Sequence, residues 1–234
     1  MSPNPPPEGE AGQTGPVMPR KRSVGIAVRR GWIGWTALEQ GIKRIQGYFA
    51  ERNRALAAVL FLGGFRVSEV VGIPGLVPGL REDQVRVVDD FIVLENVHVL
   101  KKWRYTDAYD EEGRRVRERV EEVTTRAFPV DEPVVPYFMD WVWRVRRAGY
   151  TGAELFPISR KQAWRVIRKY TGWWPHFFRA ERAIQLVVEY GWSDAQLRSF
   201  FKWTNVKTIS TYASLGASEI VKAFPPDRTG RWRW

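Results

Sequence analysis

Apolar residues recur three and four positions apart over most of the chain, which is the spacing that one face of an α-helix requires. Residues 36–64 follow this spacing until two adjacent glycines, Gly63 and Gly64, interrupt it. A short helix is expected over residues 66–73, ending near Gly72. The same pattern predicts further helices over residues 132–149, 159–172, 175–191, 193–203, 205–215 and 218–224.

One stretch in the middle of the chain has a different period. Residues 83–100 alternate apolar and polar positions and are rich in Val and Ile, which predicts strands. A third strand is expected to end within residues 126–130. The charged residues 101–125 form a long hairpin or an insertion, with a turn at 110–113. Helices, a small antiparallel sheet and more helices predict an α+β domain that is mostly helical.

Composition divides the chain into three parts. Residues 1–34 hold a Pro- and Gly-rich tail that we expect to be disordered, then a basic segment. That segment is either an arm lying along phosphates or a solvated linker. Residues 35–224 form the folded domain. Residues 225–234 contain three arginines and two tryptophans, and this basic aromatic tail either grips nucleic acid by charge and stacking or is a frayed end.

The charge of the chain indicates a class of partner. There are 37 Lys and Arg against 26 Asp and Glu, which gives a net charge of +11, and the sequence pI is about 10.1. Such an excess of positive charge favours a polyanionic partner, usually nucleic acid. A generally basic protein without such a partner is the alternative.

Composition also excludes several kinds of site. The chain has no cysteine, which excludes disulfides, thiolate zinc sites and a cysteine nucleophile. Two histidines are too few for a histidine-rich metal site, and His98 fits an ordinary strand residue. We therefore expect neither metal nor cofactor. No apolar run reaches the roughly 20 residues that span a bilayer, and the first residues lack an apolar signal core, so a cytoplasmic location is expected.

The residues with the most distinctive chemistry lie in the C-terminal third. His176 and Arg179 are three positions apart and so share a helix face, and Pro175 suggests that both lie in the first turn. An arginine fork and a histidine donor suit phosphate oxygens, and the amides at a helix N-terminus favour anions. A plain surface helix face also explains this pair.

Two aromatic residues further along add to that chemistry. Tyr212 lies in a polar run, and its hydroxyl can attack a phosphodiester to form a phosphotyrosine. Its pKa near 10 means that neighbouring cations are needed. Trp203 lies nine residues earlier and offers an indole N–H as a donor to a phosphate oxygen. Taken singly, both residues also fit core packing.

Together, His176, Arg179, Trp203 and Tyr212 resemble the C-terminal signature of the tyrosine recombinase (phage-type integrase) family. That signature is H-x-x-R, then glycine followed by His or Trp, then a tyrosine nine residues on. Lys202 stands here where the family usually has glycine. The resemblance covers the folded domain and implies the fold of that family's catalytic domain, with a small three-stranded antiparallel sheet.

The resemblance extends upstream to the sequence LGGFRVSEVVGI. Arg66 matches the family's first catalytic arginine, and Glu69, one helical turn on, matches an acidic residue that steadies the site. The family carries a catalytic lysine on a hairpin of its sheet. Lys101 and Lys102 are the lysines available there, and the choice between them stays open. Weaker substitutes are the hairpin arginines Arg114 and Arg115.

The resemblance implies a site-specific recombinase or integrase that acts on double-stranded DNA without metal or ATP. Tyr212 attacks the scissile phosphate while Arg66, Arg179, His176 and Trp203 stabilise charge on the non-bridging oxygens. A lysine protonates the leaving 5′ oxygen. Four catalytic domains meet on two duplexes, so a homotetramer on DNA is expected, associated with the nucleoid or with the DNA of a mobile element, virus or plasmid.

Other activities are compatible with the same residues. A type IB topoisomerase would cleave and reseal DNA without exchanging strands, and a regulator of the same fold would bind DNA without cleaving it. Family members usually carry a separate helical DNA-clamping domain before the catalytic one, and residues 1–34 are too few to form it. The chain is therefore a minimal recombinase, a fragment, or one half of a pair.

Overall fold

A computed structural model of the chain describes residues 32–100, 103–119 and 122–203. The helices are α2 (Trp35–Lys43), α3 (Ala50–Leu62), α4 (Val67–Val71), α5 (Val135–Arg147), α6 (Arg160–Thr171), α7 (Pro175–Val188) and α8 (Asp194–Phe201). A short 3-10 helix, η1, spans Glu82–Gln84. The strands are β1 (Val85–Val88), β2 (Phe91–His98), β3 (Trp103–Tyr109), β4 (Arg115–Arg119) and β5 (Val123–Pro129). The helices predicted over 205–215 and 218–224 lie outside the described residues.

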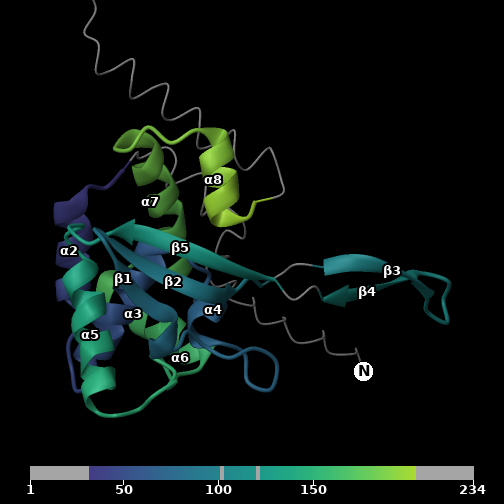
Figure 1. The fold of residues 1–234 in the computed structure, drawn as a ribbon, viewed down its shortest axis with the longest axis horizontal. Helices are drawn as coiled ribbons and strands as arrows, with labels where there is room; N and C mark the ends of the chain where they lie inside the picture. Colours follow the sequence, from purple (N-terminus) through teal and green to yellow (C-terminus); the bar gives the residue numbers. More distant parts are fainter. Residues whose placement is uncertain (1–31, 101–102, 120–121, 204–234) are drawn as a thin grey trace, which may run out of the picture.

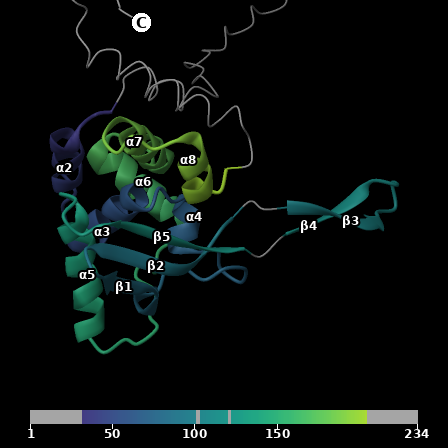
Figure 2. The ribbon, with the colours of Figure 1, turned by 45° about the horizontal axis from the view of Figure 1, so that its top comes forward.

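Helix α3 is the centre of the helical part of the fold (Figures 1 and 2). Every side chain from residue 55 to residue 62 is fully buried. The sequence there, Ala-Leu-Ala-Ala-Val-Leu-Phe-Leu, is apolar on all faces, as a helix enclosed by others requires. Helices α2, α5, α6 and α7 pack around it. The mostly helical α+β architecture predicted from the sequence is what the described residues show.

The helical pattern of residues 36–64 corresponds to two helices rather than one. Gly47, between α2 and α3, has a φ of 98°, which an α-helix does not accept. The backbone N–H of Ile45 donates to Ile42 at 3.0 Å, and this tighter turn closes α2. Periodicity alone thus located the helical segment but not the break inside it.

Strands β1, β2 and β5 form a three-stranded antiparallel sheet in the order β1-β2-β5. The strands expected in this region are confirmed. On the buried face, Ile92 and Leu94 of β2 lie opposite Phe128 and Arg126 of β5. The Phe128 ring meets the Phe138 ring of α5 with centroids 6.4 Å apart. This contact joins the sheet to the helical core.

Strands β3 and β4 form a separate two-stranded antiparallel hairpin that lies away from the main sheet in both views (Figures 1 and 2). Its turn is closed by the N–H of Gly113, which donates to the carbonyl of Asp110 at 2.9 Å. The side chains of Arg114 and Arg115 pair with Asp110 and Asp107, both at 3.0 Å. The charged hairpin and its turn are therefore confirmed.

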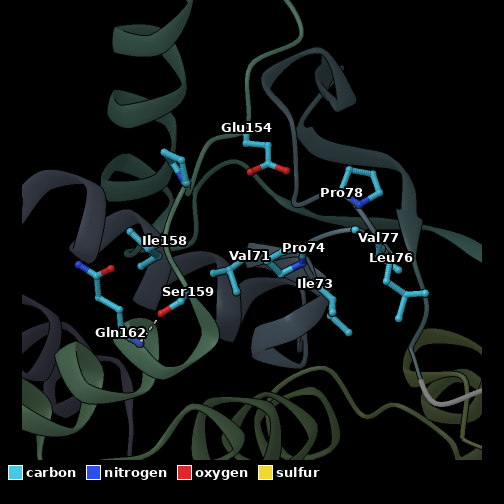
Figure 3. A pocket seen from close by; sticks show the side chains of 12 residues that line it. Val71, Ile73, Pro74, Leu76, Val77, Pro78, Glu154, Ile158, Ser159 and Gln162 are labelled. Atoms are coloured by element: carbon cyan, nitrogen blue, oxygen red, sulfur yellow. Dashed lines mark hydrogen bonds between the residues drawn. The ribbon is translucent and has the colours of Figure 1, made fainter.

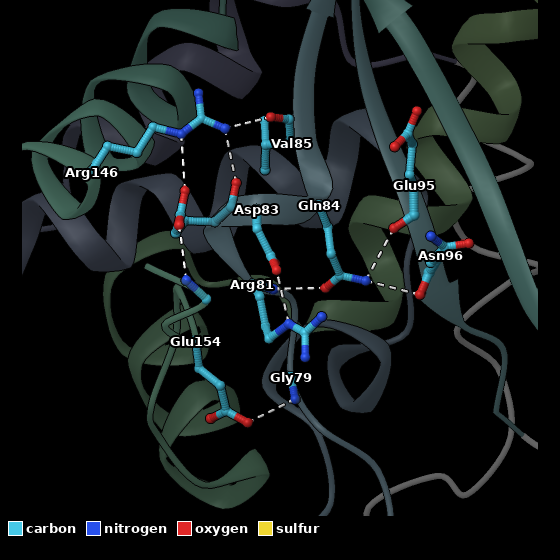
Figure 4. A network of polar contacts seen from close by, with 11 residues as sticks. Gly79, Arg81, Asp83, Gln84, Val85, Glu95, Asn96, Arg146 and Glu154 are labelled. Atoms are coloured by element: carbon cyan, nitrogen blue, oxygen red, sulfur yellow. Dashed lines mark hydrogen bonds and ion pairs between the residues drawn. The ribbon is translucent and has the colours of Figure 1, made fainter. Parts of the chain in front are cut away.

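An ion pair fixes the start of the main sheet to α5 (Figure 4). The Nε of Arg146 donates to the Glu82 carboxylate at 3.0 Å, and its Nη2 donates to the backbone carbonyls of Glu82 and Val85. The same carboxylate accepts a hydrogen bond of 2.9 Å from the N–H of Gly152. These donors, Gly152 before Arg146, hold the pKa of Glu82 below its usual value although burial opposes the shift.

Local sequence signals mark where helices α6 and α8 begin and where α6 ends. The hydroxyl of Ser159 accepts a hydrogen bond from the N–H of Gln162 at 3.1 Å and begins α6, which Gly172 ends with a φ of 75°. Ser193 and Gln196 cap α8 in the same way.

Among the helices of the described ranges, none has the length and apolar character needed to cross a membrane.

Trp32, the first residue of the described ranges, packs against the helical core. The Trp32 ring stacks on Phe61 with centroids 5.4 Å apart, and its Nε1 donates to the Glu189 carboxylate at 2.8 Å. Trp35 donates to the same carboxylate at 3.1 Å. Trp32 therefore contacts the same core as Trp35, the first residue of α2.

Candidate functional site

The site begins where α4 begins. Arg66 is the N-cap of α4, and Glu69 is the third residue of that helix. The Glu69 carboxylate folds back to accept hydrogen bonds from the backbone N–H of Arg66 at 2.8 Å and from its Nη1 at 2.7 Å. The Glu69 side chain is 3% exposed and that of Arg66 is 27% exposed. The pairing expected from their spacing is present, and it leaves Arg66 the partly accessible member.

The segment that follows β2 reaches the same carboxylate. The N–H of Leu100 donates to Glu69 at 3.3 Å, and Nη1 of Arg66 lies 3.5 Å from the carbonyl of Leu100. Leu100 directly precedes the two lysines considered for proton transfer. Lys101 and Lys102 themselves lie outside the described residues.

Arg179 enters the site from helix α7. Its side chain is 2% exposed, and its Nη1 lies 3.9 Å from the Glu69 carboxylate. Nη1 donates to the carbonyl of Gly64, and Nη2 donates to the carbonyl of Phe201 at 2.8 Å. Arg179 thus connects the loop before α4 to the end of α8. The sequence predicted a surface that binds phosphate, whereas the structure gives Arg179 a buried position with backbone partners.

Trp203 lies against this arginine. Its ring stacks on Phe201 with centroids 4.4 Å apart and an angle of 13° between the planes. The Cζ atom of Arg179 lies 4.9 Å from the centre of the Phe201 ring and 5.7 Å from that of Trp203. Cations are attracted to aromatic faces at such distances. Segments far apart in sequence therefore bring Arg66, Glu69, Arg179 and Trp203 together.

His176 and Arg179 occupy different environments on α7. Pro175 is the first residue of this helix, so His176 is in the first turn, as expected. Arg179 lies at the start of the next turn. The His176 side chain is exposed, whereas Arg179 is buried. Tyr212, the expected nucleophile, lies outside the described residues.

Sequence reasoning missed a third arginine, Arg126 of β5, which is 2% exposed. Its Cζ lies 4.5 Å from the centre of the Phe200 ring and 5.8 Å from that of Phe65. Within the described ranges, its Nε and Nη1 are buried without a hydrogen-bond partner. Burial lowers its pKa to about 10, Glu69 opposes that shift, and Arg66 adds to it. The available signal was its inward position in the strand alternation of Thr124, Arg126 and Phe128.

The comparisons with known proteins give a structural likeness but no match to a family model or a curated protein. Among solved structures, the chain is similar to the Tn1549 transposon integrase in complex with transposon right-end DNA. The identity is 16%, the TM-score is 0.44, and the match covers 82% of this chain and 65% of that one. This chain therefore spans less than two thirds of the length of the solved integrase chain.

A separate hollow of about 670 Å³ lies between the segment after α4 and the start of α6 (Figure 3). Its lining is mainly apolar, with Ile73, Leu76, Val77 and Ile158 among its residues, and Glu154 is its charged member. None of the residues of the arginine cluster lines it. This hollow is therefore separate from the arginine cluster around Glu69.

The charges of the cluster favour an anionic ligand. Three arginines, Arg66, Arg126 and Arg179, interact with the buried carboxylate of Glu69, and Glu122 also acts on Arg126. Taking charge out of water is costly unless an opposite charge compensates it. Guanidinium groups bind phosphate oxygens in planar, charge-assisted hydrogen bonds. A phosphate at Arg66, the most accessible member, would complete the charge balance of this cluster.

Proposed function

We propose that this chain is a site-specific DNA recombinase or integrase that cleaves and rejoins DNA strands through a covalent 3′-phosphotyrosine. The observation that carries the proposal is the meeting of Arg66, Arg179 and Trp203 around the buried Glu69. The sequence had assigned these residues to one site from two separate motifs. The net charge of +11 supports DNA as the partner.

In the proposed reaction, the hydroxyl group of Tyr212 loses its proton to water, and its oxygen attacks the scissile phosphorus. An oxygen–phosphorus bond to tyrosine forms while the bond from phosphorus to the 5′ oxygen breaks. Lys101 or Lys102 protonates that leaving oxygen as the general acid. Attack by a 5′ hydroxyl, of the same or another strand, reverses these steps and restores the phosphodiester.

The cluster supplies the stabilisation of charge that this reaction needs. Arg66 is accessible enough to donate to a non-bridging oxygen, and Glu69 fixes the position of its guanidinium group. Arg179 adds a nearby positive charge and holds Phe201, on which Trp203 stacks. His176 and the indole N–H of Trp203 are further donors. Donors fixed in advance stabilise a transition state without having to reorganise.

Strand exchange adds a requirement for assembly. Four copies must bring their sites together on two duplexes, so the proposed active form is a homotetramer on DNA. The segment after Tyr212, residues 217–224, is the proposed element that docks on a neighbouring copy.

Covalent trapping on nicked duplexes tests the proposal. A pool of duplexes with a nick near a randomised centre lets the released short strand diffuse away, so a cleaved intermediate accumulates. A protease-sensitive DNA adduct is expected with the wild-type chain. If no duplex of the pool gives an adduct, the result favours the alternative of a regulator that binds DNA without cleaving it. Relaxed circles without recombinant junctions, from supercoiled DNA, would identify topoisomerase activity instead.

A further inference from the structure

A groove of about 470 Å³ lies between strand β5 and helix α8. Both elements also border the candidate site, because β5 carries Arg126 and α8 ends at Phe201. The lining residues are Val123, Thr124, Thr125, Trp192, Gln196, Ser199, Phe200 and Lys202. The groove is thus distinct from the arginine cluster but adjacent to it.

The polar lining of the groove suits a phosphodiester backbone. Hydroxyl groups come from Thr124, Thr125 and Ser199, an amide comes from Gln196, and an ammonium group comes from Lys202. No Asp or Glu is among these lining residues. Phosphate contacts in protein–DNA complexes come from these same types of side chain.

Lys202 occupies an unfavourable backbone conformation at the end of α8. Its φ is 53° and its ψ is 41°, so it is in the left-handed region. Glycine is the usual residue at a helix end of this kind, because a side chain there strains the backbone. Strain retained by a residue at a site is a reason to look for a role of its side chain.

Arg126 adds a second positive charge behind the groove wall. Its guanidinium lies 4.5 Å from the centre of the Phe200 ring, and Phe200 is part of the lining. Two of its nitrogen atoms, Nε and Nη1, have no hydrogen-bond partner among the described residues. A buried guanidinium whose nitrogen atoms lack hydrogen-bond partners favours an anion nearby.

We infer that the groove between β5 and α8 binds the phosphate backbone of DNA. Lys202 contacts a phosphate, and Arg126, behind Phe200, increases the positive electrostatic potential of the groove. This inference rests on the proposed function for the identity of the ligand. It assigns Lys202 a role that glycine at the same place could not have.

The substitution Lys202→Gly tests the inference because it moves stability and binding in opposite directions. The variant loses the backbone strain, so its melting temperature should rise by about 2 °C. Its affinity for a short blunt duplex of mixed sequence, measured by fluorescence anisotropy, should fall several-fold. The slope of log K against log salt should become shallower by about 0.9, the value for one phosphate contact.

Two further variants separate the causes. Lys202→Gln keeps a side chain in the left-handed conformation and removes only the charge, so it should bind DNA as weakly as the glycine variant without gaining stability. Arg198→Gln is the matched control, because Arg198 lies on α8 and is exposed but does not line the groove. It removes the same charge and should leave the salt slope closer to that of the wild type.

An unchanged salt slope in Lys202→Gly, or an equal loss in Arg198→Gln, would overturn the inference. Arg126→Met, which keeps an apolar chain against Phe200, should fold and bind DNA more weakly. Covalent trapping distinguishes the two proposals. If the wild type forms an adduct but the salt slope of Lys202→Gly is unchanged, the groove does not bind DNA and the proposed reaction stands. If the salt slope becomes shallower but no adduct forms, the groove binds DNA and the proposed reaction is wrong.

Discussion

Arg179 of α7 donates a hydrogen bond of 2.8 Å to the backbone carbonyl of Phe201, the last residue of α8. Its other terminal nitrogen donates to the carbonyl of Gly64, two residues before Arg66. One buried side chain therefore fixes the approach to α4 and the exit from α8. The two arginines therefore differ in role. Arg66 is the accessible positive charge, and Arg179 holds the backbone segments around it in place.

Replacing Arg66 should reduce cleavage far more than it reduces stability. The Arg66 side chain is 27% exposed, and Glu69 keeps two backbone donors without it, the N–H groups of residue 66 and Leu100. Arg66→Ala should cost about 1 kcal/mol of unfolding free energy and slow cleavage by about 10²- to 10³-fold. Single-turnover cleavage and urea titration measure the two effects. Equal losses in DNA affinity and in rate would indicate plain phosphate binding.

Replacing Arg179 should affect the fold as well as the reaction. Arg179→Ala removes the side-chain donor from the buried carbonyls of Gly64 and Phe201, and the cost should be about 3 kcal/mol. Arg179→Lys retains the charge but not the fork that reaches both carbonyls. We expect both variants to lower the urea midpoint, with the Ala variant lower. A midpoint equal to that of Arg66→Ala would contradict the buried role.

Tyr212→Phe should abolish the covalent adduct while DNA binding is retained, since it removes only the hydroxyl that forms the bond to phosphorus. Adduct formation is scored as a protease-sensitive shift of nicked DNA on a denaturing gel. Tyr150→Phe is the control, because Tyr150 is 66% exposed and is not part of the cluster. Persistence of the adduct in Tyr212→Phe would mean that another residue is the nucleophile.

Three substitutions at Trp203 separate hydrogen bonding from packing. Trp203→His retains an N–H donor, so most activity should remain. Trp203→Phe retains stacking on Phe201 but has no donor, and it should lose more activity than the histidine variant. Trp203→Ala loses both and should be the least active. If the Phe variant is as active as the wild type, Trp203 acts only through the stack at 4.4 Å.

The stability of the chain should decrease in alkali partly through Tyr190. Burial and the neighbouring Glu132 raise its pKa to about 12, against an ordinary value near 10. A raised pKa in the folded state means that the contribution is complete below about pH 10 and is lost as the pH rises towards 12. The difference in urea midpoint between wild type and Tyr190→Phe should therefore shrink over this range. The effect should be small because Tyr190 is 45% exposed, and a difference independent of pH would contradict it.

Local patterns were sufficient to predict much of the fold. The alternation in β2 and β5 predicted the central sheet, and the turn at Asp110 follows from residue types that act over a few positions. The break between α2 and α3 depends on the conformation of Gly47. Helical periodicity continues across that glycine, so the pattern could not reveal the break.

The sequence predicted one contact of the candidate site but not the arrangement of its residues. The spacing of Arg66 and Glu69 within one helical turn was enough to predict their ion pair. The burial of Arg179 depends on Gly64 and Phe201, which lie in distant segments. Arg126 was missed because a charged residue in a strand is usually taken to face solvent, and the rings that cover it come from α8 and the loop before α4.

The complete enclosure of α3 has a consequence for how this protein can vary. Eight consecutive side chains, from residue 55 to residue 62, have no exposed surface. A substitution there changes the volume of a side chain that is packed on all sides. An added methylene group or a cavity therefore disturbs the packing of the neighbouring helices. Drift in this segment is therefore confined to exchanges of similar volume or to paired changes across an interface. The exposed tip of the β3–β4 hairpin carries no such restriction, so lineages of this protein should diverge fastest there and slowest in α3.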